Sequence, residues 1–217
     1  MSQSGLYIVI EGNDGTGKTT QVDLLAEYFR GQNREVVVVE EPGSDDPDKS
    51  TPIANEIRRL IKDGSLERAP EINLALFSMA RRELWHQKIK PSLSGGAVVL
   101  STRNYYSSLA YQGRGEGVSE AEILEMTKLF TDQRYMNPDV MVILTLDHDS
   151  RRRRIAQRGE LEKPDTFESR PDDFQDRVNQ AYIDIAAKRN LTTIDASASI
   201  DDIQAQIQQV IENYLQK

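Results

Sequence analysis

A lysine and a threonine close a glycine-rich segment near the start of the chain, and these residue types can hold phosphate groups. Residues 12–19 read Gly-Asn-Asp-Gly-Thr-Gly-Lys-Thr and fit the pattern G-x-x-x-x-G-K-[ST]. Glycines let backbone N–H groups face phosphate oxygens, and the N-terminus of a following helix adds partial positive charge. Lys18 can reach the β- and γ-phosphates of a nucleoside triphosphate, and the Thr19 hydroxyl can ligate Mg²⁺. The expected triphosphate site comprises Gly12, Asn13, Asp14, Gly15, Thr16, Gly17, Lys18, Thr19 and Thr20.

The flanking sequence separates this segment from an ordinary glycine-rich turn. An apolar run, residues 6–10, comes before it, and residues 18–32 have helical spacing. A strand, a glycine loop and a helix in this order are the setting in which the pattern binds phosphate. The sequence therefore favours a phosphate site over a simple turn.

A second group of polar side chains follows another apolar run, residues 97–101. Residues 103–113 read Arg-Asn-Tyr-Tyr-Ser-Ser-Leu-Ala-Tyr-Gln-Gly. An arginine, two hydroxyls, an aromatic ring and an amide within eleven residues make a poor core sequence. They suit a nucleotide pocket.

Apolar runs alternate with helical patterns along the chain. The runs are short, rich in valine and isoleucine, and show little polar alternation, as in parallel strands buried on both faces. The expected strands are residues 6–10, 35–39, 97–101, 140–146 and 191–194. The expected helices are residues 18–32, 51–62, 70–92, 119–132, 150–158, 171–188 and 199–215. This order predicts a single α/β domain over residues 1–217, a three-layer, doubly wound parallel sheet of five strands. Ligands of such sheets bind outside the carboxyl ends of the strands.

Composition excludes several classes of protein. The chain has no cysteine, so disulfides and thiolate metal sites are excluded. Its net charge of −8 argues against a protein that wraps nucleic acid. No apolar stretch approaches the roughly 20 residues that span a bilayer, and the N-terminus has no signal-peptide pattern. We expect a cytoplasmic protein without nucleic-acid or membrane partners.

With these residues in place, the chain resembles the thymidylate kinase family from its first strand to its C-terminal helix. Residues 103–113 are similar to the family's Asp-Arg-Tyr-x-x-Ser-Ser-x-Ala-Tyr-Gln-Gly segment. Asp14-Gly15, Glu41-Pro42-Gly43, and residues 55–58 and 76–81 resemble further family motifs. The resemblance implies a P-loop NTPase fold of the nucleoside monophosphate kinase type. It also implies transfer of phosphate from ATP to dTMP with Mg²⁺, and a homodimer.

The resemblance also implies roles for residues that bind the acceptor. Arg58 and Arg103 correspond to arginines that hold the dTMP phosphate, and Phe77 corresponds to a phenylalanine that stacks on thymine. Arg81 corresponds to an arginine that hydrogen-bonds the base. Phe77 and Arg81 are four residues apart and share one helix face; from the residues alone, Phe77 would be assigned to the core.

Further roles follow from the same resemblance. Ser108 and Gln112 would contact the base, and Tyr111 would lie under the deoxyribose and disfavour a 2′-hydroxyl. Asp14 would lie near the acceptor's 3′-hydroxyl and phosphate, and Glu41 belongs to the motif that lines the acceptor site.

A charged segment, residues 158–171, is expected to be a mobile lid, although a disordered surface loop has the same composition. Family members with a glycine at the position of Gly15 take an arginine for the transferring phosphoryl group from this lid, which indicates Arg154 or Arg158. The expected catalytic residues are Asp14, Lys18, Arg103 and Arg158.

Three positions depart from the family pattern. Thr102 stands where an aspartate usually helps order Mg²⁺, Glu40 stands where an arginine is usual, and Thr166 replaces a lid arginine found in many members. Glu11 or Glu41 could take the place of the missing carboxylate. Two alternatives stay open: a kinase for another nucleotide or nucleoside, and a nucleotide-binding protein with reduced turnover.

Overall fold

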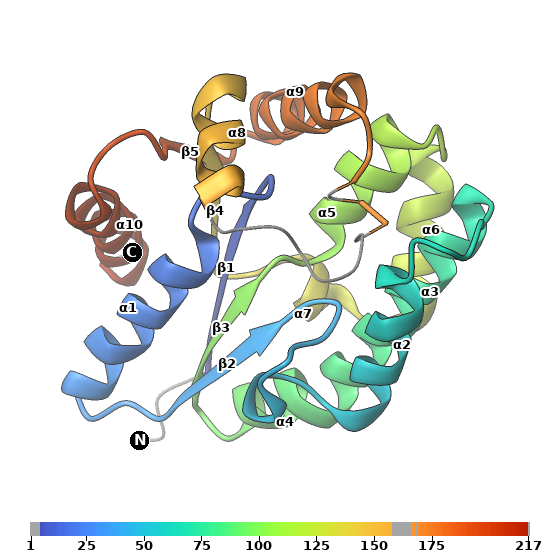
Figure 1. Cartoon of the computed structure of the whole chain (residues 1–217). Helices are drawn as coiled ribbons and strands as arrows, with labels where there is room; N and C mark the ends of the chain where they lie inside the picture. Colours follow the sequence, from blue (N-terminus) through green and yellow to red (C-terminus); the bar gives the residue numbers. More distant parts are fainter. Residues whose placement is uncertain (1–4, 158–165, 168, 217) are drawn as a thin grey trace.

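The computed structural model describes residues 5–157, 166–167 and 169–216. The described residues form a sheet of five parallel strands in the order β2-β3-β1-β4-β5 (Figure 1). The strands are β1 (Leu6–Gly12), β2 (Val36–Glu40), β3 (Val98–Thr102), β4 (Val140–Thr145) and β5 (Thr192–Asp195). Each expected strand is present, with ends shifted by one or two residues.

Helices cover both faces of this sheet. The α-helices are α1 (Lys18–Gly31), α2 (Pro52–Lys62), α3 (Pro70–Leu84), α4 (Lys90–Ser94), α5 (Tyr105–Ser108), α6 (Glu120–Phe130), α7 (Gln133–Met136), α8 (His148–Gln157), α9 (Asp172–Arg189) and α10 (Ile200–Leu215). A 3₁₀-helix, η1 (Pro47–Lys49), and two π-helices, η2 (Trp85–Ile89) and η3 (Leu109–Gly115), complete the described elements. Each described helix is too short or too polar to cross a bilayer.

The strands are apolar on both faces because each face meets a separate layer of helices. Leu6, Ile8 and Ile10 of β1 pack with α1 and α10, whereas Tyr7 and Val9 pack with α2, α3 and α9. Alternate residues of a strand point to opposite faces, so one short apolar run fills two cores. The expected three-layer α/β fold is confirmed.

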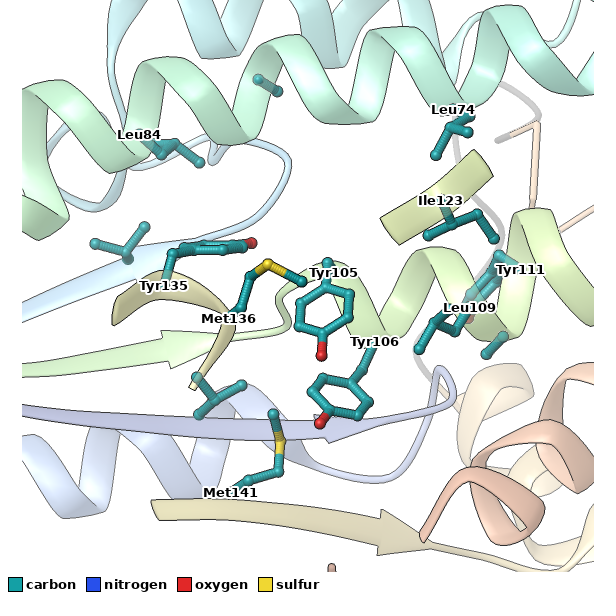
Figure 2. Packing of buried hydrophobic residues seen from close by; sticks show 14 of the residues in the cluster. Leu74, Leu84, Tyr105, Tyr106, Leu109, Tyr111, Ile123, Tyr135, Met136 and Met141 are labelled. Carbon is teal, nitrogen blue, oxygen red and sulfur yellow. The ribbon is translucent and has the colours of Figure 1, made fainter. Parts of the chain in front are cut away.

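The larger core contains several tyrosines. Figure 2 shows Tyr105, Tyr106 and Tyr135 with Met136 between the sheet and the helix that carries Leu84. The Tyr105 and Tyr106 rings lie 4.5 Å apart between centroids. This layer supports the segment after β3, where the second group of polar residues lies.

Two features of the helices differ from the sequence prediction. The expected helix over residues 70–92 divides into α3, η2 and α4; Pro91 has no N–H for a helical hydrogen bond, and a π-turn lies just before it. Helices α5, η3 and α7 were not expected, because they are too short to show a clear apolar period.

Asp139, just before β4, joins four parts of the fold. Its carboxylate accepts hydrogen bonds from the Tyr7 amide at 2.7 Å, the Tyr214 hydroxyl at 2.7 Å and the Arg134 guanidinium. Burial opposes ionisation, but these donors lower the pKa of Asp139 below its usual 3.8. The carboxylate therefore stabilises the fold above pH 3.8, and this stabilisation disappears as pH falls through the lower folded-state pKa.

Asp139→Asn should lower the free energy of unfolding at pH 7 by about 2 kcal/mol, because it replaces charge-assisted hydrogen bonds with weaker ones. The deficit should shrink as pH falls below about 4, because the unfolded wild-type chain binds a proton there first and the folded carboxylate follows at its lower pKa. Urea unfolding at pH 7 and pH 3 measures both values. An equal deficit at the two pH values would contradict the assignment.

Candidate functional site

A cavity of about 760 Å³ lies at the carboxyl ends of β1, β2 and β3. Its walls come from the loop after β1, the ends of β2 and β3, and helices α1, α2, α3, η3 and α8. This is the edge of a doubly wound sheet at which ligands bind. The two groups of polar residues found in the sequence meet at this cavity.

The glycine-rich loop requires its glycines. Gly12, Gly15 and Gly17 have φ angles of 141°, 88° and 87°, which L-residues with side chains rarely adopt. A Cβ at Gly12 would also lie 2.4 Å from the Leu144 carbonyl oxygen of the neighbouring strand. Helix α1 then begins at Lys18, and its N-cap, Gly17, has no side chain to satisfy the first amides. These amides face the cavity as an anion site.

Lys18 is held inside the loop. Its Nζ donates to the Asn13 carbonyl at 2.9 Å and lies 4.0 Å from an Asp14 carboxylate oxygen. The Asn13 side chain accepts from the Asp14 amide at 2.8 Å and from the Tyr111 hydroxyl at 2.9 Å. Thr19, on the first turn of α1, lines the same cavity. The loop therefore presents the Lys18 ammonium group and the Thr19 hydroxyl beside its amides.

Arg103 crosses from the end of β3 to the glycine-rich loop. Its guanidinium pairs with Asp14 and donates to the Gly12 carbonyl at 3.2 Å and the Ser107 hydroxyl at 3.0 Å. Burial opposes its charge, but Asp14, Tyr111, Tyr182 and Glu11 together outweigh burial and raise the pKa of Arg103. Its φ of 77° is strained for a residue with a side chain, and such strain gathers at functional sites.

Glu11 lies beneath this arrangement. It is fully buried, and its carboxylate accepts from the Asn104 amide at 2.8 Å, the Ser107 amide at 3.0 Å and the Tyr182 hydroxyl at 3.0 Å. These donors fix the start of α5 against β1. Glu11 is therefore an anchor below the cavity and is not among the residues that line it. Its use as a metal-ordering carboxylate stays a prediction. In the sequence, only its position directly before Gly12 pointed to Glu11.

A second arginine, Arg58 on α2, also lines the cavity. Both of its terminal nitrogens bind Asp45, at 2.6 and 3.1 Å. The Arg58 side chain is 19% exposed, whereas that of Asp45 is 87% exposed. A well-positioned cavity cation is thus paired with a solvent-facing loop carboxylate.

Arg81 lies behind the cavity wall. It is 2% exposed and donates to Glu41 at 3.0 Å, the Ser108 hydroxyl at 2.8 Å and the Asn104 carbonyl at 3.2 Å. Burial raises the pKa of Glu41 to about 7, although Arg81 and the Tyr135 hydroxyl act in the opposite direction. Phe77 covers Arg81, with the guanidinium carbon 5.7 Å from the ring centroid, and forms part of the wall.

Helix η3 supplies the wall next to Phe77. Tyr111 and Gln112 both line the cavity. The Tyr111 hydroxyl donates to Asp14 at 2.9 Å, so the ring spans the space between η3 and the glycine-rich loop. The cavity is thus lined by the glycine-rich loop and by aromatic and amide side chains.

Arg154 on α8 reaches the outer rim of the glycine-rich loop. It donates to the Ala196 carbonyl at 2.7 Å and lies 3.5 Å from the Gly15 carbonyl. Arg158 and most of the expected lid lie outside the described residues. Near the end of that segment, Phe167 packs against Phe77 with ring centroids 5.5 Å apart. Thr166 donates its amide to the Lys62 carbonyl at 3.3 Å.

The other two departures from the family pattern also lie at the cavity. Thr102 is 5% exposed at the end of β3. Glu40 ends β2, accepts from the Ser44 hydroxyl at 2.7 Å and lies 3.5 Å from Lys49 Nζ. Ser44 and Lys49 were not singled out in the sequence, because only the folded loop brings them to Glu40.

The residues present suit a magnesium ion that is carried by a nucleotide. The Thr19 hydroxyl and the Glu40 carboxylate line the cavity, and both supply the oxygen ligands that Mg²⁺ prefers. Mg²⁺ commonly takes its other ligands from water and substrate phosphates. Two protein oxygen donors are therefore enough, because water and the nucleotide would supply the other ligands.

A doubly wound parallel sheet with this loop between β1 and α1 defines a P-loop nucleotide-binding protein. The thymidylate kinase family model matches residues 10–207. The chain is 35% identical over 215 residues to a thymidylate kinase of Bifidobacterium longum, covering 96% of this chain and 98% of that protein. It is 34% identical over 209 residues to one of Deinococcus radiodurans, covering 95% and 96%. A solved structure of thymidylate kinase from Ehrlichia chaffeensis has a TM-score of 0.73 and 29% identity, covering 96% and 99%. The chain belongs to the thymidylate kinase family.

Proposed function

We propose that the protein transfers the γ-phosphoryl group of ATP to dTMP, giving ADP and dTDP. Family membership carries this proposal, together with one geometric observation. Lys18 on the glycine-rich loop, Arg103 after β3 and Arg58 on α2 all line one cavity. Two anionic ligands can therefore meet in a single space that supplies positive charge to both.

The donor side would hold the ATP phosphates. The amides of the glycine-rich loop and Lys18 would bind the β- and γ-phosphates, and Arg154 would approach from the rim. Thr19 would hold Mg²⁺, which neutralises phosphate charge when bound. Residues Gly12 to Thr20 are thus assigned to ATP.

The acceptor side would hold dTMP. Arg58 and Arg103 would bind its phosphate, and Phe77 would stack on the base, as the family resemblance implies. Tyr111 would contact the sugar, with Asp14 beside it. Arg81, Ser108 and Glu41 would act as a buried set behind the base, whereas Gln112 would contact it directly.

The reaction needs positioning and charge more than proton transfer. The attacking oxygen belongs to a phosphate and is already anionic, so no strong base is required. Both histidines have partners elsewhere: His86 lies 3.2 Å from Arg82, and His148 lies 2.5 Å from Asp176. An arginine at the transferring group can accelerate such reactions by ~10³–10⁵. Arg154 or Arg158 would provide it, and the lid role of residues 158–171 stays a prediction.

Turnover of dTMP with ATP and Mg²⁺ tests the proposed function. Lys18→Ala should lower kcat/KM by roughly 10²–10³-fold, because it removes a preorganised charge from the transferring phosphates. Coupled detection of ADP measures the rate. Equal rates for the wild-type and variant proteins would contradict the proposal.

The same assay separates the two alternatives. A panel of dTMP, dUMP, dCMP, dGMP and thymidine identifies a kinase for another acceptor by a clear preference for that acceptor. ATP binding without ADP production identifies a nucleotide-binding protein without turnover. The two arginines, Arg58 and Arg103, favour an enzyme whose acceptor already carries a phosphate group.

Asp45 competes with the acceptor phosphate for Arg58. Both nitrogens that a phosphate would use are taken by its carboxylate. Because Asp45 is exposed, its pair with Arg58 is worth only about 0.2–1 kcal/mol. Asp45→Asn should therefore tighten dTMP binding by roughly two- to fivefold, measured as Kd by calorimetry.

Asp48→Asn is the matched control for this measurement. It removes the same charge from the same loop, where only the Asp48 backbone carbonyl contacts a cation, Lys88. Its Kd for dTMP should change less than that of Asp45→Asn. Equal changes in Kd for both variants would mean that the effect comes from net charge alone and would contradict the competition. Weaker dTMP binding by Asp45→Asn would instead mean that Asp45 positions Arg58 for the phosphate.

We also propose that the protein is a homodimer through α2, α3 and α6. These helices lie next to one another (Figure 1). They also carry exposed apolar side chains. The residues are Ile53 and Leu60 on α2, Ile72 and Met79 on α3, and Leu129 on α6, each at least 46% exposed. Both pairs are spaced seven residues apart, which places each pair on one helix face.

Sedimentation velocity tests this arrangement. The wild-type protein should sediment at twice the mass of one chain, and Met79→Glu should sediment as a single chain. Leu215→Glu, which changes an exposed apolar residue on α10, should leave the dimer intact. A monomeric wild-type protein would contradict the assignment. A cytoplasmic location and the absence of nucleic-acid and membrane partners stay predictions.

A further inference from the structure

Glu116, directly after η3, has a buried carboxylate that none of the roles above uses. Its side chain is 5% exposed. It accepts hydrogen bonds from Asn73 Nδ2 at 2.8 Å, Gln112 Nε2 at 3.3 Å and an Arg170 terminal nitrogen at 3.2 Å. A carboxylate this enclosed must gain from its partners, because burying an unpaired charge is costly.

The π-helical turn brings Glu116 to Gln112. The Glu116 amide donates to the Tyr111 carbonyl at 2.9 Å, a bond that spans five residues. Gly115, just before it, packs against Phe174 so closely that a Cβ would lie 2.7 Å from the ring. The backbone of η3 is therefore fixed from outside, and the two side chains meet on one side of it.

The contacts of Arg68 determine the direction of the neighbouring amide. Arg68 donates to the Leu60 carbonyl at 2.7 Å, the Ile61 carbonyl at 2.8 Å and the Asn73 Oδ1 at 2.9 Å. A guanidinium can only donate, so the oxygen of Asn73 must face Arg68. The nitrogen of Asn73 then faces Glu116.

The same rule fixes the amide of Gln112. An ionised carboxylate can only accept, so Glu116 must receive the Gln112 nitrogen. The Gln112 oxygen is then turned the other way, and within the described part of the chain it accepts no hydrogen bond. Gln112 lines the cavity beside Phe77. Hydrogen bonds thus link Arg68, Asn73, Glu116 and Gln112 in one chain with a fixed direction at each step. This chain ends at the proposed base site.

We propose that Glu116 is a positioning residue that presents the Gln112 oxygen to the acceptor base and thereby selects pyrimidines with a ring N–H. Thymine and uracil carry a hydrogen at N3, which this oxygen can accept. Cytosine carries a lone pair at N3, which faces the oxygen without a hydrogen between them. This selection rests on the proposed function, because it takes the base of a nucleoside monophosphate as the ligand of this wall.

Glu116→Gln tests the proposal. A glutamine at position 116 can donate as well as accept, so the Gln112 amide is free to turn and offer its nitrogen to cytosine. The ratio of kcat/KM for dTMP to that for dCMP should fall by roughly tenfold, about the value of one well-made hydrogen bond. The change should lie mainly in KM, because Glu116 does not touch the transferring phosphate.

Glu125→Gln is the matched control, since Glu125 is an exposed residue of α6 and the change removes the same charge. It should leave the ratio unchanged. Asn73→Leu interrupts the ordered chain one step earlier and should lower the ratio by a smaller factor, so it tests the proposal if Glu116→Gln does not fold. In a Gln112→Leu background, Glu116→Gln should have no further effect on the ratio.

Calorimetric Kd values for dTMP and dCMP separate this proposal from the function on which it rests. A wild-type protein that phosphorylates dTMP while Glu116→Gln keeps the full ratio would overturn the role of Glu116 alone. A wild-type protein without turnover would contradict the kinase, yet a loss of binding preference in Glu116→Gln would still support the role of Glu116. Equal wild-type affinity for dTMP and dCMP would overturn it.

Discussion

Positive charge gathered in a partly enclosed cavity must be balanced, and this constraint organises the whole site. Three cations that line the cavity have an acceptor within the protein: the Asn13 carbonyl for Lys18, Asp14 for Arg103 and Asp45 for Arg58. Arg81, behind the wall, has Glu41. The acceptors differ in burial. Asp45 is exposed and is the easiest to exchange for a phosphate, whereas Glu41 is buried with Arg81 and fixes the wall. Burial thus separates exchangeable pairs from structural ones.

The fold brings these charged residues together. Parallel strands bring the ends of β1, β2 and β3 to one edge, and the residues that follow these three strands line the cavity. Glu11 ties the segment after β3 to the end of β1 by accepting from two amides and a hydroxyl. Arg103, with its positive φ of 77°, comes directly before Asn104, the first of these donors.

The strands, the glycine-rich loop and most helices could be predicted from the sequence. The short helices and the partners of the buried charges could not. The strands and the glycine-rich loop carry local signals, since burial on both faces gives continuous apolar runs and the loop needs glycine at fixed positions. Helices α5, η3 and α7 are held by tertiary contacts rather than by a period of their own. The carboxylates that pair with Arg58 and Arg81 lie 13 and 40 residues away in the chain. No local pattern identifies such partners, and none identifies Glu116 as the residue that orients Gln112.

A crystal structure with a bisubstrate mimic, in which a nucleoside triphosphate analogue is joined to thymidine, tests the central claim most directly. Phosphate oxygens should replace Asp45 at Arg58 and the Asn13 carbonyl at Lys18, while the pair between Arg81 and Glu41 stays intact behind the base. If the phosphates instead lie away from Arg58 and Lys18, and both cations keep their protein partners, the exchange of internal acceptors for substrate phosphates is contradicted.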